Sequence, residues 1–290
     1  MVPHARANRP SVLRHFGVQT VRPPPRLFGI LARDAPVVAV LRRGPSGWAH
    51  VGRWDVAAST YQVGAWLRGT LYPQRCDLSP DGRYLASMAI VARADWAPGT
   101  TYVAVSRLPW LTALAAWGTR GTWSRGVHFA ARGEWGMTAP EHGDADPLRS
   151  RHGLVVTAAA QSYAVERRGG WVEAPGPLAR SPNDMWDERR ADQLVMTKPQ
   201  PRGGAVLSVS GGRAAFRGGP HGSWADPMYA LDGDPLPDVQ WADWARDGRM
   251  LVATTAGELQ VRDPADVVWE LDLAPLEPDP QPPPTEATRW

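Results

Sequence analysis

The sequence contains a single cysteine, Cys76, among 290 residues. One thiol cannot form a disulfide within the chain, and its scarcity favours a reducing, cytoplasmic compartment. Cys76 falls in an expected strand, where a buried and unreactive thiol is the usual role. No run of eighteen apolar residues occurs, so the sequence predicts no membrane-spanning helix. The first residues are basic but lack the apolar run of a secretory signal.

A strong excess of one charge is also missing, because 32 basic residues face 29 acidic ones and the net charge is only +3. Arginines are interleaved with Asp and Glu along the chain, whereas a nucleic-acid interface needs basic side chains that cluster. Nucleic acid is therefore not an expected partner, despite a pI near 9.3. Lysine is nearly absent as well, since Lys198 stands alone. Abundant Arg, Ala, Gly and Pro are typical of a GC-rich bacterial genome.

Helical periodicity is almost missing too. The longest candidate, Leu108 to Trp117, opens on Leu-Pro-Trp and runs into Gly118, which favours strands. Elsewhere apolar and polar residues alternate, and clusters of Gly, Pro, Asp and Ser interrupt them roughly every eight to twelve residues. With 43% hydrophobic and 21% charged residues the composition is that of a globular protein. The sequence predicts an all-β fold of many short strands.

One unit recurs: residues 76–89 read CDLSPDGRYLASMA and residues 242–256 read ADWARDGRMLVATTA. Each is an apolar strand, a tight turn and a second strand. Asp-Gly supplies the positive φ angles that a two-residue hairpin demands. Three looser versions occur, and their steps of 47, 52, 59 and 55 residues are nearly regular when the turns are marked by Asp34, Asp81, Gly133, Asp192 and Asp247.

Each unit is followed by material for two further strands, which makes a four-stranded meander. Such a sheet cannot bury both faces alone, but copies packed around an axis can, and that arrangement is a β-propeller. Fifteen tryptophans suit the wedge between neighbouring blades. We expect a single five-bladed β-propeller of four-stranded antiparallel blades over residues 23–274. Two β-sandwiches remain the alternative, because they share the same turn rhythm.

The two best copies of the unit resemble known proteins. SPDGRYLAS at 79–87 and ARDGRMLVA at 245–253 are similar to the first turn of WD40-like and TolB-like bacterial propeller repeats. The resemblance implies the propeller fold and an accessory subunit of a bacterial multiprotein system. The Gly-His pair that opens many WD40 repeats is missing, and Trp54-Asp55 does not recur at the equivalent strand position of the other units. The resemblance therefore points to the superfamily and to no subfamily.

The ends of the chain differ from the rest. Within residues 1–22, the stretch Ser11 to Val21 alternates like a strand and is followed by three prolines. We expect it to close the ring by pairing with the outer part of the last blade. Residues 275–290 are Pro-rich and polar, which predicts an extended, mobile tail.

Acidic residues stand just before three of the expected turns, at Asp77, Asp187 and Asp243. Facing carboxylates in a central funnel would suit a glycoside hydrolase. However, the equivalent residues of the other two units are Ile30 and His128. A structural Asp that accepts backbone N–H bonds from the adjacent turn explains the same recurrence, and we favour it.

Other motifs are weak. The acidic loops EHGDADP and LDGDPLPD match no calcium-binding spacing and indicate turns; they contain Glu141, His142, Asp144 and Asp146, and residues 231–238. The seven histidines show no metal-ligand spacing. Gly-Gly pairs lack a phosphate-binding pattern and indicate turns; they lie at 169–170, 203–204, 211–212 and 218–219. The sequence predicts no catalytic residue, cofactor or metal site.

The function that these observations favour is a non-catalytic propeller whose loops bind another protein. Rigid blades fix such loops while their sequence varies, although the inference leans on the fold. The alternatives are a glycoside hydrolase-like enzyme with acids in the funnel, and a propeller that binds a carbohydrate or another small molecule. No membrane partner is expected.

Overall fold

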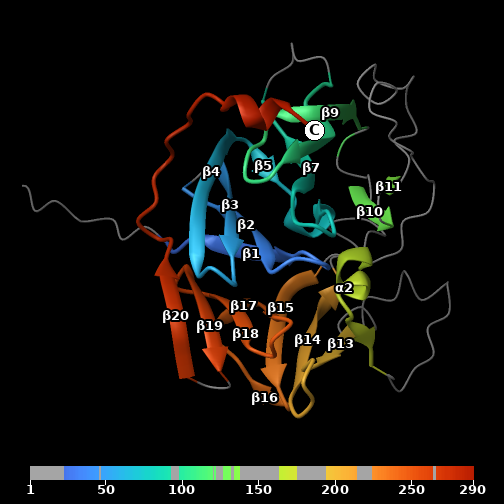
Figure 1. Ribbon diagram of the computed structural model, residues 1–290, viewed down its shortest axis with the longest axis vertical. Coiled ribbons are helices and arrows are strands. Elements are labelled where there is room, and N and C mark those ends of the chain that lie inside the picture. The colour runs from blue at the N-terminus through green and yellow to red at the C-terminus, as the bar shows by residue number, and fades with distance from the viewer. Residues whose placement is uncertain are drawn as a thin grey trace, which may run out of the picture.

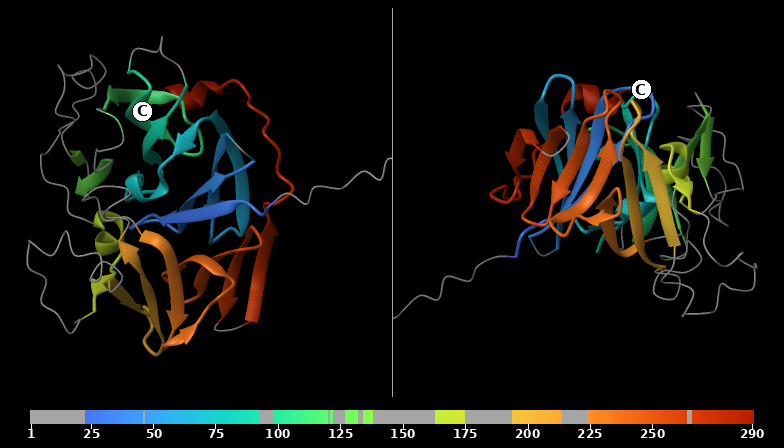
Figure 2. Two further views of the ribbon diagram at one scale, coloured as in Figure 1. Left: turned by 180° about the vertical axis from the view of Figure 1, so that it is seen from behind. Right: turned by 90° about the horizontal axis from the view of Figure 1, so that it is seen from below.

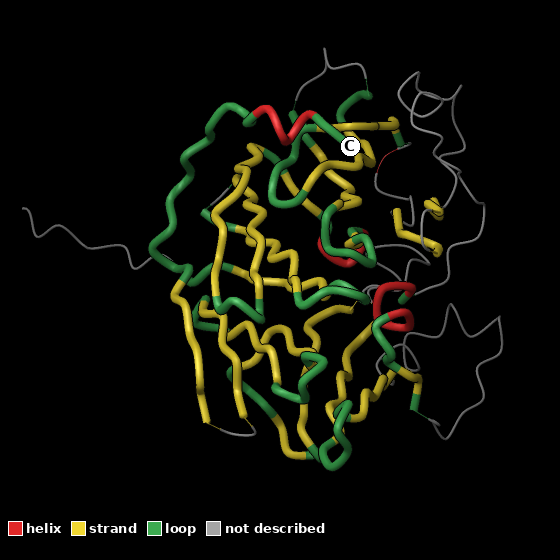
Figure 3. Tube along the Cα trace, in the orientation of Figure 1, coloured by secondary structure: helices red, strands yellow, loops and turns green. Residues whose placement is uncertain are grey.

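Antiparallel strands make up most of the computed structural model (Figures 1 and 3). It describes residues 23–45, 47–92, 98–119, 121, 127–131, 134–137, 163–174, 194–213, 224–263 and 266–290. Regular helix within these ranges is confined to short pieces, among them α2 (Ala164–Arg168) and the 3₁₀ turns η1 (Pro73–Arg75) and η4 (Thr285–Thr288). The prediction of an all-β fold is confirmed.

The N-terminal half of the described chain forms three sheets. The first sheet contains β1 (Arg26–Leu31), β2 (Val37–Arg43), β3 (Trp48–Asp55) and β4 (Thr60–Arg68). The second contains β5 (Thr70–Leu71), β7 (Tyr84–Ile90), β8 (Thr101–Arg107) and β9 (Ala113–Gly118), with β6 (Asp77–Leu78) paired to β7. The third is the pair β10 (Val127–Ala131) and β11 (Glu134–Met137).

Two larger sheets follow. The fourth contains β12 (Val172–Glu173), β13 (Leu194–Pro199), β14 (Val206–Arg213), β15 (Trp224–Leu231) and β16 (Asp234–Pro235). The fifth contains β17 (Val239–Trp244), β18 (Met250–Thr254), β19 (Glu258–Asp263) and β20 (Asp266–Asp272). In the first, fourth and fifth sheets the strand order is the chain order, as a meander requires.

The first, second and fifth sheets each pack on neighbours through both faces. The first sheet shares one apolar cluster with the second and another with the fifth, where Trp54 and Trp241 lie together. The fourth sheet packs on the fifth, and the second packs on Phe129 of β10. Figure 1 shows β1 and β17, which contact each other, toward the middle of the molecule and β20 at its edge. Because both faces are covered, β2 is buried along its first six residues.

Gly29 of β1 shows how closely the first and fifth sheets approach. A Cβ atom at this position would lie 2.6 Å from the ring of Trp241. A glycine in the strand therefore leaves room for the indole between the two sheets.

The two Asp-Gly turns lie where the repeat predicts them. Gly82 and Gly248 have φ angles of +72° and +87°, which favour glycine. Neither Asp81 nor Asp247 has a positive φ, so these are not the two-residue hairpins expected, which need two such residues. Each aspartate instead accepts the N–H of the arginine two residues later. The turn is longer, and the aspartate side chain stabilises it.

Parts of the third and fourth copies of the unit lie outside the described residues, and some of the parts that are described differ from the expectation. Their turn markers, Gly133 and Asp192, lie outside the described residues. However, β12 takes the place beside β13 that the first strand of the fourth unit, DMWDERRADQLVMT at 184–197, was expected to fill. The stretch SYAVERRGGWVEA at 162–174 is one of the two further strands expected after the third unit, but its residues 164–168 form α2. The segment AVERR is rich in helix formers, with Glu166 in its first turn and two arginines in its last, which suits the helix dipole.

The C-terminal segment is held at both ends. The Arg42 guanidinium donates to the carbonyl oxygens of Ala274 and, at 2.9 Å, Leu276. At the other end, Ala287 is fully buried and the ring centroid of Trp290 lies 5.5 Å from that of Tyr84. Figures 1 and 2 show this segment, in red, running from β20 past the first sheet to the second. Its extended backbone agrees with its proline content, whereas its end is packed rather than free. The expected strand at Ser11–Val21 lies outside the described residues.

Replacing Trp290 with alanine is expected to lower the free energy of unfolding by about 2 kcal/mol, less than for a fully buried tryptophan because this one is half-buried. Thermal melting followed by circular dichroism measures the change. Trp290→Phe keeps an aromatic ring against Tyr84 and should melt close to the wild type. Equal melting temperatures for the alanine and phenylalanine variants would show that the tail does not anchor the second sheet.

Candidate functional site

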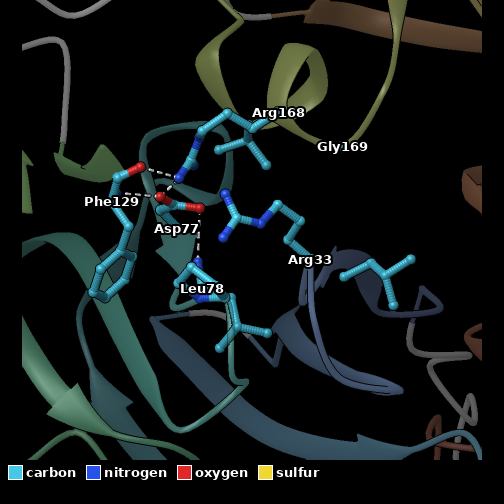
Figure 4. Close-up of a pocket in the computed structure, with 9 residues that line it drawn as sticks. Arg33, Asp77, Leu78, Phe129, Arg168 and Gly169 are labelled. Atoms are coloured by element: carbon cyan, nitrogen blue, oxygen red, sulfur yellow. Dashed lines mark hydrogen bonds and ion pairs between the residues drawn. The ribbon is translucent and has the colours of Figure 1, made fainter. Parts of the chain in front are cut away.

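A small pocket lies between the first sheet, the second sheet and α2 (Figure 4). Its walls include Arg33, Asp77, Phe129, Arg168 and Gly169. The space that the centre of a water molecule can reach is about 20 Å³, room for one or two waters. Pockets that bury a small organic ligand have about 300–1,000 Å³. The pocket is therefore a gap of water size rather than a ligand cavity.

Asp77 of β6 accepts three hydrogen bonds at this pocket and is 2% exposed. Its carboxylate accepts the N–H of Leu78 at 2.8 Å and the N–H of Phe129 at 2.5 Å. The guanidinium of Arg168 forms an ion pair with the same carboxylate and also donates to the carbonyl oxygen of Phe129. Figure 4 shows these groups converging from three elements. Asp77 thus joins the second sheet, β10 and α2.

The ionisation of Asp77 reflects two opposed effects. Burial raises the pKa of its carboxyl, whereas the Arg168 charge and the two backbone N–H donors lower it. Both carboxylate oxygens have donors, so the ionised form is the one that these contacts need. A general acid would instead have to present an O–H group to a substrate.

Asp243 of β17 repeats this arrangement between the fourth and fifth sheets and is 8% exposed. It accepts the N–H of Trp244 at 2.7 Å, and the Lys198 ammonium lies 2.5 Å from it. The indole of Trp244 donates to the carbonyl oxygen of Lys198 at 3.0 Å. Burial raises the pKa of Asp243, and the Lys198 charge opposes the rise. The one lysine of the chain is therefore the counter-ion of a buried acid.

Two of the three aspartates that precede expected turns thus have the structural role that the sequence favours over catalysis. Asp77 and Asp243 accept backbone N–H bonds, although from the next residue and a neighbouring strand rather than from the turn. Ile30 is buried in β1, Asp187 lies outside the described residues, and so does the side chain of His128.

A second small cavity, next to the first, lies beside Asp243. The two share Leu31, Val165 and Gly169 as walls. This cavity is lined by the aromatic residues Trp171, Tyr229 and Trp241 and offers about 30 Å³ to water centres. Part of α2 and the residue after it therefore stand between two gaps of water size.

The turns that follow β1, β6, β13 and β17 are linked to one another at one end of the sheets. The Asp34 N–H donates to the carbonyl oxygen of Pro80 at 2.7 Å. Arg246 donates to the Arg33 carbonyl oxygen and pairs with Asp34. The Gln200 amide donates to the carbonyl oxygen of Gly248 at 2.5 Å. We call residues 32–36, 79–83, 200–204 and 245–249 the turn belt.

The turn belt presents charged side chains on a fixed backbone. Its exposed charged residues are Arg33, Asp34, Asp81, Arg83, Arg202 and Arg246. The sequence predicts all four turns, three from the repeated unit and one from the Gly-Gly pair at 203–204, but their mutual contacts join residues 46 to 213 positions apart. No local signal could have found those contacts.

The remaining sequence motifs that fall within the described residues have structural roles. Cys76 is buried, donates to the carbonyl oxygen of Tyr72 at 3.1 Å, and burial raises its pKa to about 12. Residues 231–238 hold a turn with Gly233 at a φ of +91°, whereas residues 141–147 lie outside the described ranges. Where the chain is described, no group of three or more His, Cys, Asp or Glu could hold a metal. No helix of the described chain has the length and apolar character to cross a membrane.

Comparison with protein-family models and with curated proteins finds no match for this chain. Its function must therefore be inferred from the geometry of its own residues.

Proposed function

We propose that the chain is a five-bladed β-propeller that serves as a non-catalytic scaffold or accessory subunit in a bacterial multiprotein system. The contacts between the sheets support this architecture. They run from the fourth sheet to the fifth, from the fifth to the first, and from the first through the second to β10. Arg168, just before the fourth sheet, then reaches back to Phe129 of β10. This order would close a ring of five blades, as in the WD40-like and TolB-like proteins that the repeat resembles.

The turn belt is the observation on which the scaffold role depends. Loops usually vary and move, whereas backbone hydrogen bonds and ion pairs hold these turns against their neighbours. A partner that binds there loses little entropy in ordering the surface. The arginines also offer the bidentate contacts that are common at protein interfaces.

The alternative enzyme is less well supported by the same residues. A glycosidase needs one acid that protonates a leaving group and a second that faces it. Asp77 and Asp243 are each paired with a basic side chain, and the gaps beside them have room for only about one or two waters. The aromatic residues Trp171 and Tyr229 are buried against the gap beside Asp243 rather than lining an open sugar pocket.

Charge reversal on the turn belt tests the proposal. In the double variant Arg83→Glu/Arg202→Glu, proteins that co-purify with the wild-type chain from its native host should fall at least tenfold, about 1.4 kcal/mol of binding. Quantitative mass spectrometry measures their abundance. The matched control is Arg43→Glu/Arg68→Glu. These exposed arginines lie at the ends of β2 and β4 that point away from the turn belt.

The control variant should retain the partners. Equal loss in both variants would mean that the belt is not the binding surface. A wild-type chain that captures nothing above an untagged control would overturn the scaffold role itself.

A further inference from the structure

Buried polar side chains form a row on the face of the first sheet that turns toward the fifth. Arg42 of β2 lies opposite His50 of β3, and His50 lies opposite Trp66 of β4. Arg42 is 4% exposed and His50 is 0% exposed. A charged group at such depth needs compensation from its surroundings.

The partners of Arg42 carry no full negative charge. Its guanidinium donates to the carbonyl oxygens of Gly44, Ala274 and Leu276, and it lies 5.3 Å from the centroid of the Trp66 ring. Its Nε has no hydrogen-bond partner within the described chain. Burial lowers the pKa of the Arg42 guanidinium, as expected for a cation without a counter-ion.

His50 adds a second donor without an acceptor. Its Nε2 accepts the N–H of Gly64 at 3.3 Å, so the neutral ring carries its proton on Nδ1. That Nδ1 is buried and, among the residues described, has no partner.

Tyr61 supplies a third donor, because its ring lies across Gly52. A Cβ at residue 52 would be 2.0 Å from the Tyr61 hydroxyl oxygen, so the glycine makes room for the phenol. The ring centroids of Tyr61 and His50 are 6.4 Å apart. The hydroxyl is buried with no partner in the described structure, and the indole Nε1 of Trp54, opposite Tyr61 in the register, is in the same state.

Among the described residues, this face therefore gathers unpaired donors around a cation, and no carboxylate balances its charge. A water molecule has two lone pairs and no charge, so it would leave a donor unsatisfied and the guanidinium uncompensated. An anion accepts all the donors and balances the charge. We propose that Arg42, His50 and Tyr61 bind one monovalent anion of halide size, with chloride as the physiological species. Because Arg42 also binds the carbonyl oxygens of residues 274 and 276, the anion supports the start of the C-terminal segment.

Thermal melts at constant ionic strength test the site, with sodium chloride or bromide replacing sodium gluconate. The wild-type melting temperature should rise by about 2–4 °C once the free halide is tenfold above its Kd. Tyr61→Phe keeps the ring over Gly52 but removes a donor, and less than half of the rise should remain. Tyr102→Phe, at a buried tyrosine of the second sheet, should keep the full rise.

A crystal of the whole chain grown in bromide decides the identity of the occupant. One anomalous peak among Arg42 Nε, His50 Nδ1 and Tyr61 Oη is the expected result. A water at that place without anomalous signal would overturn the proposal, as would a melting temperature that responds to halide equally in the wild type and Tyr61→Phe. If Tyr61→Phe does not fold, the bromide crystal of the wild type decides alone.

Discussion

Replacing Lys198 with methionine is expected to lower the free energy of unfolding by about 3–5 kcal/mol. The ammonium is the charged partner of Asp243, and both residues are less than a tenth exposed. Methionine has nearly the same length but no charge, so the carboxylate would remain buried without its cation. Urea denaturation at pH 7 measures the loss. An unchanged m-value would show that the variant exposes as much surface on unfolding as the wild type.

A second substitution separates the cost of an isolated charge from the value of the pair. In Lys198→Met/Asp243→Leu both charged groups become apolar, and most of the lost stability should return, because a buried ion pair is often no better than apolar packing. Arg33→Met removes an exposed partner of Asp34 and should change stability little. If Lys198→Met proved as mild as Arg33→Met, Asp243 would not depend on a buried cation.

The repeated turn is the feature of the fold that the sequence predicts best. Its geometry is local, because a glycine with positive φ and an aspartate that accepts a nearby N–H lie within a few residues of each other. Asp81-Gly82 and Asp247-Gly248 therefore lie where the repeat places them. The turn type was wrong, since a two-residue loop and a slightly longer one use the same residues.

The ion pairs between residues that are far apart in the chain could not be predicted from the sequence. Arg168 binds Asp77 across 91 positions, and it does so from a helix that alternation had suggested to be a strand. Lys198 is the one lysine of the chain, but the residues around it in the sequence do not indicate that Asp243 is its partner. Which face of a strand a neighbouring sheet will cover depends on packing between distant segments.

One residue of the C-terminal segment indicates from the sequence that the end of this segment is packed. Proline content correctly indicates extended backbone, but it does not distinguish a free tail from a packed one. A tryptophan at the end of a polar stretch suggests an anchor, because a large aromatic side chain gains most from burial. Trp290 packs against Tyr84 in that way.

Acidification from pH 6.5 to pH 4 is expected to cost about 3 kcal/mol of unfolding free energy through His50 alone. Burial, and then the charge of Arg42, lower the pKa of His50 from 6.5 to about 4. Between these two values the unfolded chain binds a proton at His50 and the folded chain does not. Stability is therefore fully present above pH 6.5 and falls as the pH drops toward the folded pKa, by about 1.4 kcal/mol per pH unit.

Urea denaturation of the wild type and of His50→Phe, in gluconate at half-unit steps of pH, isolates this contribution. Other groups titrate equally in both proteins, so the difference between the two curves belongs to His50. Parallel curves would mean that His50 takes up its proton equally well in the folded and unfolded chain. Chloride adds an independent check on the site beside Arg42. A bound anion favours the imidazolium and raises the pKa of His50, so the acid-induced loss should shrink in saturating chloride.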